Sequence, residues 1–358
     1  MRILPDPRRY SATSASPLVA LAQRLAQTPA SQHDEPDKSL EQAVARLLAE
    51  ARADLVQEAI REAPCAAICR TLLEAVDSAL VRRLQADGAQ IRLFAIPIVV
   101  VTGGEAGAVV PSAVGDAAEL TRVFEAAGAL GPVRNFGFSN ALTSRASLEA
   151  VSWTALLRIA QSDEPVELGP LALEPEDIVL HTGEDQVDLR FLPGAAVTRA
   201  DAPTFLETAG AIGRWGIPFT RTLAKQLSTR AATVLPIPRP PMGFVRAAHA
   251  GSFARAELGF QLFVSNALRR ARSRFGDPDV CVAAHSDATV RVRLTSPLDE
   301  SFVEEYRWAL GPADDLDEVA RSILDLLAEV RLDRVAVLDT VQPAAPGTAE
   351  DAGDAVDI

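Results

Sequence analysis

The stretch Leu93-Phe94-Ala95-Ile96-Pro97-Ile98-Val99-Val100-Val101 runs directly into Thr102-Gly103-Gly104-Glu105-Ala106-Gly107. An apolar run of this length, rich in β-branched residues and followed by glycines, predicts a buried strand in the core of the fold. Glycine lets backbone N–H groups approach an anion closely, and α/β proteins often hold a phosphate where a strand opens onto glycines. Thr102, Gly103 and Gly104 are therefore candidate ligand-binding residues.

The glycine spacing does not match a known nucleotide-binding motif. Gly103, Gly104 and Gly107 fit neither the dinucleotide-binding fingerprint nor the P-loop, and no lysine follows them. Glu105 would also repel a phosphate. A second stretch, residues 135–140, is rich in glycine and amides and could line the same site. It adds three candidates, Asn135, Ser139 and Asn140.

The composition is that of a folded protein, with 358 residues of which 48% are hydrophobic. This length is sufficient for two domains. The N-terminus lacks the apolar run of a signal peptide, and residues 93–101 are far fewer than the ~20 that cross a bilayer. Three cysteines fit a reducing compartment, and the near absence of lysine is typical of bacteria with GC-rich genomes. We therefore expect a cytoplasmic bacterial protein.

The net charge of −13 argues against affinity for nucleic acid or anionic membranes, because both repel an acidic protein. The charge is uneven, since residues 221–275 are basic and residues 276–358 are acidic, and the two segments can neutralise each other in the fold. The run from Arg269 to Arg274 ends a predicted helix, where cations interact favourably with the helix macrodipole. Neither nucleic acid nor a membrane is therefore an expected partner.

Helical spacing dominates the start of the chain. Residues 1–38 are expected to form a flexible arm, which contains a short and loosely tethered helical pattern over Leu18 to Leu25. Ser39 and Gln42 then form a capping box that starts an amphipathic helix over residues 39–63. A second helix follows and ends at Gly88.

Cys65 and Cys69 are four residues apart in this second helix and so share a face. They could bind a metal or form a redox pair, but both continue an apolar stripe and no nearby Cys or His completes a ligand set. We expect both thiols to be buried, with no metal and no cofactor. The histidines have no metal-binding or catalytic spacing and are His33, His181, His249 and His285.

After the glycines, Asp116 and Glu119 cap a helix that Gly128 ends. Another helix is predicted over residues 147–161, and short alternating runs predict strands within residues 163–201. Residues 236–243 contain four prolines, which exclude helix interior and central strand. An extended connector is expected there, with a polyproline ligand for a partner groove as the alternative.

Ser252 is expected to cap a helix that ends at Gly276. Apolar and polar residues alternate over residues 289–295, which predicts an antiparallel strand with one solvent-facing side. The other elements expected in this part are strands over 280–284, 306–310 and 334–338 and a helix over 315–330.

These elements predict a mixed α+β fold in two domains. The N-terminal α/β domain, residues 39–200, would hold the helix pair and a small mixed sheet. The C-terminal domain, residues 201–342, would be an α+β layer with antiparallel strands. Residues 343–358 are rich in alanine, proline and acids and are expected to be a disordered tail.

No catalytic constellation is visible in the sequence. We therefore favour a protein of interaction, assembly or regulatory type that acts through a protein partner, and we lean against an enzyme. The alternative is a small-ligand or phosphate-binding enzyme that uses the loop after residues 93–101. In that case the loop at Gly103 and the stretch 135–140 should converge on one pocket, whereas separate loops would favour an interaction protein.

Overall fold

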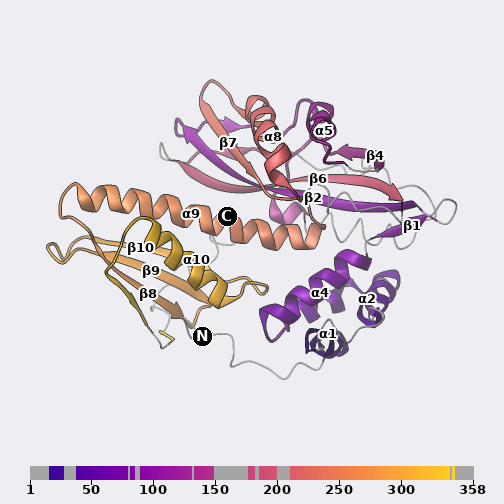
Figure 1. The fold of residues 1–358 in the computed structure, drawn as a ribbon, viewed down its shortest axis with the longest axis horizontal. Helices are drawn as coiled ribbons and strands as arrows, with labels where there is room; N and C mark the ends of the chain where they lie inside the picture. Colours follow the sequence, from indigo (N-terminus) through magenta and orange to yellow (C-terminus); the bar gives the residue numbers. More distant parts are fainter. Residues whose placement is uncertain are drawn as a thin grey trace. The chain divides into compact units, whose positions relative to one another are not determined.

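The computed structural model describes residues 16–27, 38–79, 81–84, 89–130, 133–148, 176–181, 185–199, 210–338 and 341–342 (Figure 1). Helices and antiparallel sheets occur in the one chain, which confirms the predicted mixed α+β class. The tail 343–358 and most of the helix predicted over residues 147–161 lie outside the described residues.

The helices are α1 Pro17–Gln27, α2 Ser39–Ala49, α3 Ala53–Arg61, α4 Ala66–Ala79, α5 Ala117–Ala126, α8 Ile212–Leu227, α9 Phe244–Arg272 and α10 Leu316–Glu329. The strands are β1 Arg82–Leu84, β2 Ala89–Gly104, β3 Val109–Val110, β4 Val133–Phe138, β5 Ile178–Val179, β6 Gln186–Arg199, β7 Ala232–Pro238, β8 Asp279–His285, β9 Thr289–Thr295, β10 Val303–Ala309 and β11 Val335–Val337.

The chain forms two compact units. The larger unit contains Ser16–Ile60 and Arg70–Ser252, and the smaller unit contains Arg61–Cys69 and the described residues from Phe253 onward. The division after Ser252 falls inside α9, whereas the expected domain boundary is at residue 201. The physical reason is that β7 pairs with β2, so that this part of the chain completes the sheet of the larger unit.

In the larger unit, β2 is central in a sheet of order β1-β2-β6-β4, and β7 pairs with β2 beyond the end of β1. Both faces of β2 are covered. Phe94 and Ile96 belong to a core with α5 and α8, whereas Leu93 and Ala95 pack with the first turns of α9. This double cover explains why β2 is apolar at successive positions instead of alternating.

Two helices cover the first of these faces. The carboxylate of Asp116 caps α5 by accepting a hydrogen bond of 2.9 Å from the backbone N–H of Glu119, as predicted. Gly128 follows the helix with a φ of +62°, a conformation that favours glycine. Helix α8 has no counterpart in the sequence prediction, although its buried residues recur at every fourth position: Trp215, Phe219, Leu223 and Leu227.

The N-terminal helices differ from the expectation in three ways. Helix α1 lies within the expected flexible arm and packs its buried face against α2. The single helix expected over residues 39–63 is two helices, because Ala51 adopts a left-handed φ of 57°. The break changes the buried face, so that Val56 is buried while Leu55 is half-exposed. The predicted capping box is also wrong, because Lys38 occupies the N-cap and makes no side-chain capping bond.

The prediction for the cysteine pair is wrong for Cys65 and confirmed for Cys69. Helix α4 begins only at Ala66, so Cys65 precedes the helix and is exposed. Its backbone carbonyl accepts a hydrogen bond of 3.1 Å from the N–H of Cys69, whose side chain is fully buried. The two thiols therefore have different environments.

Helix α9 begins at Phe244 and not after Ser252. The Ser252 hydroxyl donates a 2.9 Å hydrogen bond to the carbonyl of Ala248, so it lies in the helix interior and does not cap. The proline-rich segment before the helix is extended, as expected, and its first residues belong to β7 at the margin of the sheet.

The smaller unit confirms the predicted order of strands and helix. Its sheet has the order β10-β9-β8-β11, antiparallel except that β11 runs parallel to β8. The second half of α9 and helix α10 cover one face. The opposite face of β9 is only partly solvent-facing: Arg293 is exposed, but Arg291 is buried and its guanidinium lies 2.6 Å from the carboxylate of Asp287.

Among the helices that the structure describes, none combines the length and the apolar character needed to span a membrane.

Candidate functional site

The glycines after the central strand lie inside the sheet. Gly103 and Gly104 are the last residues of β2 and pair with β7. A Cβ atom on Gly104 would collide with the backbone of Ala231, so a close approach of two strands requires this glycine. Thr102 is fully buried, and its hydroxyl has no hydrogen-bond partner among the described residues.

Two backbone donors of the turn that follows, those of Glu105 and Gly107, are already engaged. The N–H of Glu105 donates to the carbonyl of Ala231 at 3.2 Å, and the N–H of Gly107 donates to the carbonyl of Leu180 at 2.7 Å. An anion site needs several N–H groups that point at the ligand. This turn uses its donors to hold neighbouring segments of the protein.

The second candidate stretch lies at the other end of the sheet. In β4, Phe138 is opposite Gly194 of β6, which in turn is opposite Phe94 of β2. Gly103 lies nine residues further along β2, and at ~3.3 Å per residue this is about 30 Å. The structure therefore groups Thr102 with Gly103 and Gly104 at one end of the sheet.

Asn135, Ser139 and Asn140 belong to the other end. The N–H of Ser139 donates to the carbonyl of Pro193, and the carbonyl of Asn140 accepts from the N–H of Val114. The two groups of candidate residues do not converge on one pocket.

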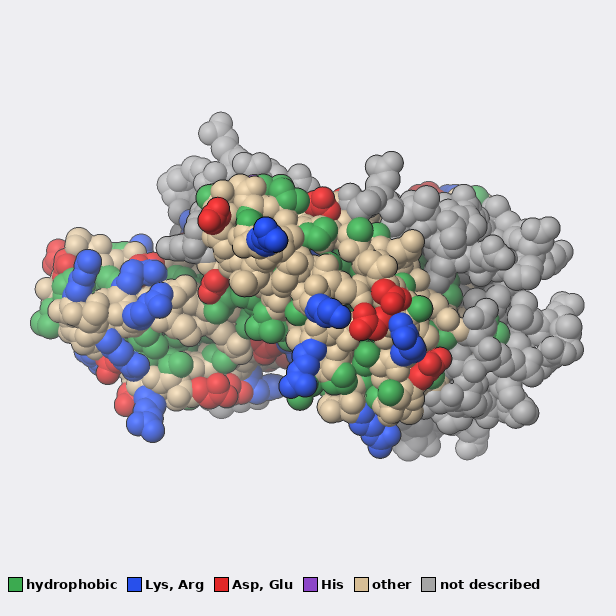
Figure 2. All heavy atoms as spheres, turned by 90° about the horizontal axis from the view of Figure 1, so that it is seen from above, with side chains coloured by type: hydrophobic (Ala, Val, Ile, Leu, Met, Phe, Trp, Pro, Cys, Tyr) green, Lys and Arg blue, Asp and Glu red, His purple; other side chains and the backbone are tan. Residues whose placement is uncertain are grey.

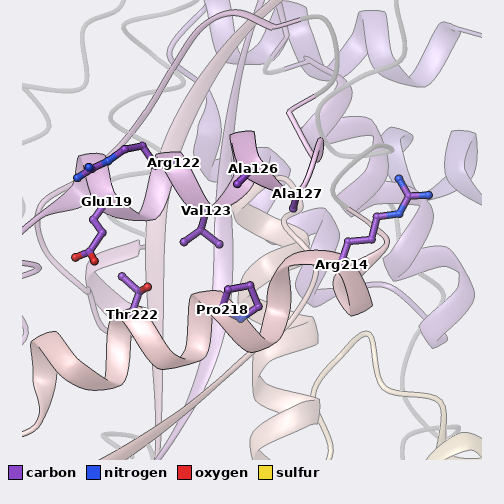
Figure 3. Close-up of a pocket in the computed structure, with 8 residues that line it drawn as sticks. All are labelled: Glu119, Arg122, Val123, Ala126, Ala127, Arg214, Pro218 and Thr222. Carbon is purple, nitrogen blue, oxygen red and sulfur yellow. The ribbon is translucent and has the colours of Figure 1, made fainter.

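A shallow pocket of about 360 Å³ lies between α5 and α8 (Figure 3). Arg122 is held by an ion pair with Asp116 at 3.2 Å, and Figure 3 shows the guanidinium of Arg214 pointing away from Glu119 and Arg122. None of the candidate residues lines this pocket. In the parts of the chain that the structure describes, no group of His, Cys, Asp and Glu side chains could hold a metal ion.

A buried ion pair links α4 to the start of α9. Nε of Arg246 lies 2.7 Å from a carboxylate oxygen of Asp77, which is buried. Burial raises the pKa of Asp77 above its ordinary value, while the guanidinium of Arg246 and the backbone N–H groups of Val245 and Arg246 oppose this rise. Gly243 passes so close to the carboxylate that a Cβ there would collide with it. Oδ1 of Asp77 has no hydrogen-bond partner among the described residues. Because the pair joins two helices of the larger unit, we assign it to the stability of that unit.

The arginines at the end of α9 are engaged with the protein itself. Nε of Arg270 lies 2.9 Å from Glu304, and Arg272 contacts Asp277 at 2.6 Å and donates to the carbonyl of Val330. Figure 2 shows cationic and acidic side chains interspersed over the described part of one face. The basic segment 221–275 is thus partly neutralised by the acidic segment that follows it.

The margins of the sheets differ in whether another strand can pair with them. At the margin of the larger sheet, the N–H of Val234 donates to the Ser228 hydroxyl at 3.2 Å and the N–H of Ala232 to Thr229. Pro236 and Pro238 are the next residues of β7 whose backbone groups point outward, and proline has no N–H. All the outward donors of β7 are therefore bonded or missing, which closes this margin to strand addition.

Strand β10 has the opposite character. The N–H of Leu310 donates to Ala288 and continues the β9–β10 ladder. The even-numbered residues of β10 therefore bond to β9, and the odd-numbered residues direct their backbone groups outward. We call these outward groups the open edge, formed by Val303, Glu305, Arg307 and Ala309. In the described part of the chain no strand pairs with this margin.

The other strand margins that the structure describes are short or irregular. Strands β1 and β11 have three residues each, β3 and β5 have two each, and β4 has a register shift next to Val133. Short strands and bulges are the usual means of preventing pairing between sheets. β10, with seven residues and no proline, lacks this protection.

Helix α9 packs against one face of β10, next to the open edge. The Tyr306 hydroxyl donates a 2.7 Å hydrogen bond to the carbonyl of Ala256, and its ring packs against Phe260 and Phe263. Burial raises the pKa of Tyr306 to about 12, so its hydroxyl remains a donor at physiological pH. Gly259 leaves room for this contact, because a Cβ there would lie 2.9 Å from the tyrosine oxygen.

Apolar side chains are exposed in the connection between β9 and β10 and at the first residue of β10. Leu298 is 76% exposed and Val303 is 47% exposed. On the uncovered face of the strand, Glu305 lies between arginines, 3.0 Å from Arg307 and 3.8 Å from Arg291. The open edge thus combines unpaired backbone groups with exposed apolar residues and paired charges. The sequence predicted the strand but not its place at the margin, which depends on pairings between distant residues.

Comparison with known proteins gives no match: no family model, no curated protein and no solved structure is similar to this chain.

Proposed function

We propose that this chain is an interaction or assembly protein whose open edge on β10 accepts an extended segment of a protein partner as an additional strand. The observation that carries the proposal is the row of outward backbone groups on a regular seven-residue margin. Backbone hydrogen bonds supply affinity in this mode of recognition, and pockets for alternate side chains supply specificity.

The surroundings of the edge indicate what the bound segment would contain. Its side chains on one face would lie beside Tyr306 of β10 and Phe263 of α9, both of which are partly buried. Its side chains on the other face would lie beside Glu305 and Arg307. A segment with apolar residues alternating with charged ones fits both faces.

Two variants at one position test the proposal. Arg307→Ala and Arg307→Pro both remove the guanidinium, but only proline removes the outward N–H. We expect wild type and Arg307→Ala, immobilised sparsely so that two copies cannot pair with each other, to select extended peptides from a phage-displayed random library. Arg307→Pro, immobilised in the same way, should select none. Bound peptide should slow amide hydrogen exchange at Val303, Glu305, Arg307 and Ala309. Equal selection by both variants, or protection elsewhere in the chain, would refute strand addition at β10.

We also propose that the protein acts in the bacterial cytoplasm and does not bind nucleic acid. The cysteines are free thiols, which suits a reducing compartment. The net charge of −13 opposes association with a polyanion. A nucleic-acid gel shift at ~150 mM salt, near physiological ionic strength, would contradict the second statement.

A further inference from the structure

We infer that the segment received by the open edge is β10 of a second copy of this chain, so that two β10 strands pair antiparallel about a two-fold axis. This inference rests on the proposed function, because it names the occupant of the same edge. It follows from the alternation of inward and outward backbone hydrogen-bonding groups along β10 and from the charges on this strand.

The alternation of inward and outward backbone groups restricts the registers that two such strands can adopt. Outward residues must face outward residues for their N–H and C=O groups to exchange hydrogen bonds. A two-fold axis at Tyr306 places Val303 opposite Ala309 of the second copy and Glu305 opposite Arg307 of the second copy. Every residue of β10 then has a cross-strand neighbour, because the two strands overlap over their full length.

Charge then selects this register over its neighbours. Moving the axis by one residue in either direction places Glu305 opposite Glu305 or Arg307 opposite Arg307. Like charges directly opposite each other destabilise a strand pair, whereas opposite charges stabilise it. The Glu305 side chain already lies 3.0 Å from Arg307 within one chain, so both groups are on the same face and next to the edge. The strand is therefore self-complementary in one register.

The face covered by helix α9 does not decide the register. Glu304 would lie opposite Trp308 of the second copy, but Trp308 is 1% exposed in its own chain and Glu304 is already paired with Arg270. The choice of register therefore rests on the charges of Glu305 and Arg307.

Cysteine cross-linking tests the register directly. The pair Val303 and Ala309 would have Cα atoms ~5.5 Å apart across the interface, within the range of a disulfide. Within one chain the same positions are six residues apart, about 20 Å in a strand, so they cannot react with each other. In a Cys65→Ser background, we expect Val303→Cys/Ala309→Cys to form a disulfide-linked dimer of twice 38.0 kDa on mild oxidation.

The controls separate this register from random collision. Each single cysteine variant alone should remain uncross-linked, and an equimolar mixture of the two should yield the dimer. The unmodified protein should sediment as a dimer over ~1–100 μM, since association depends on concentration. Arg307→Glu should shift it to monomer, whereas Arg321→Glu, an equal charge change on an exposed residue of α10, should not.

The outcomes distinguish this inference from the proposed function. A monomer over the whole range, or equal cross-linking by a single variant, would overturn the self-pairing. If the monomer still selected peptides that Arg307→Pro loses, strand addition would stand with another protein as the occupant. If the monomer selected no peptide either, both the self-pairing of β10 and the proposed strand addition would be refuted.

Discussion

Replacing Asp77 by alanine should destabilise the larger unit more than any change to an exposed ion pair. The carboxylate of Asp77 is buried and contacts Arg246 at 2.7 Å. Alanine removes the charge and the link between α4 and α9. The neighbouring Gly243 cannot supply a replacement, since it has no side chain.

The size of the effect follows from these contacts. Removing one partner of a buried ion pair costs about 3–5 kcal/mol when the other charge stays buried. The Arg246 side chain is 39% exposed, so its guanidinium can gain water once the carboxylate is gone. This lowers the expected loss toward the smaller figure. We therefore expect a loss of about 3 kcal/mol in the free energy of unfolding.

Urea unfolding at pH 7, followed by far-UV circular dichroism, measures this loss. Asp54→Ala is the matched control, because Asp54 pairs with Arg52 at 3.5 Å and both side chains are more than half exposed. Exposed pairs contribute less than about 1 kcal/mol. If Asp77→Ala were no more destabilising than Asp54→Ala, the reasoning about burial would be refuted.

Three further predictions follow from the geometry. Because burial raises the pKa of Asp77 above its ordinary value of 3.8, the folded state binds this proton more tightly than the unfolded state. As the pH falls through the folded-state pKa of Asp77 toward 3.8, wild type should therefore gain stability relative to Asp77→Asn. Urea titrations of the two proteins at the same pH values measure this difference. A loss of stability relative to Asp77→Asn would mean that folding lowers the pKa of Asp77. Maleimide should label Cys65 rapidly in the native protein and Cys69 only after unfolding, and equal rates would contradict their different burial. Gly194→Ala should lower stability by about 1–3 kcal/mol in a thermal melt, since its Cβ would collide with the ring of Phe94, and an unchanged melting temperature would show that the ring can move.

The C-terminal elements show how far local sequence reaches. Strands β8, β9 and β10 and helix α10 lie where periodicity and capping residues predict them, because each buries one face of its own against a neighbour. Asp116 and Asp315 act as N-caps through hydrogen bonds to residues two or three positions away. Such contacts involve only nearby residues, so the sequence alone specifies them.

The errors have a common origin in contacts between distant segments. The early start of α9 depends on such contacts, because Phe244, Ala247 and Ala248 in its first turns pack with apolar residues of β2. Local propensity is a weak preference that such packing overrides. The candidate glycines illustrate the same point, because Gly104 is required by the backbone of Ala231, more than a hundred residues away.

By itself the sequence determined the mixed α+β class and the order of most strands and helices, because those depend on periodicity within each segment. Pro236 and Pro238 already exclude β7 from a central position in a sheet, because proline has no N–H to donate. Tertiary structure alone decided that the other outward donors of β7 are bonded and that β10 is open at its margin. Which backbone groups of these two strands point outward depends on the strand beside them, and that neighbour is chosen by the fold as a whole.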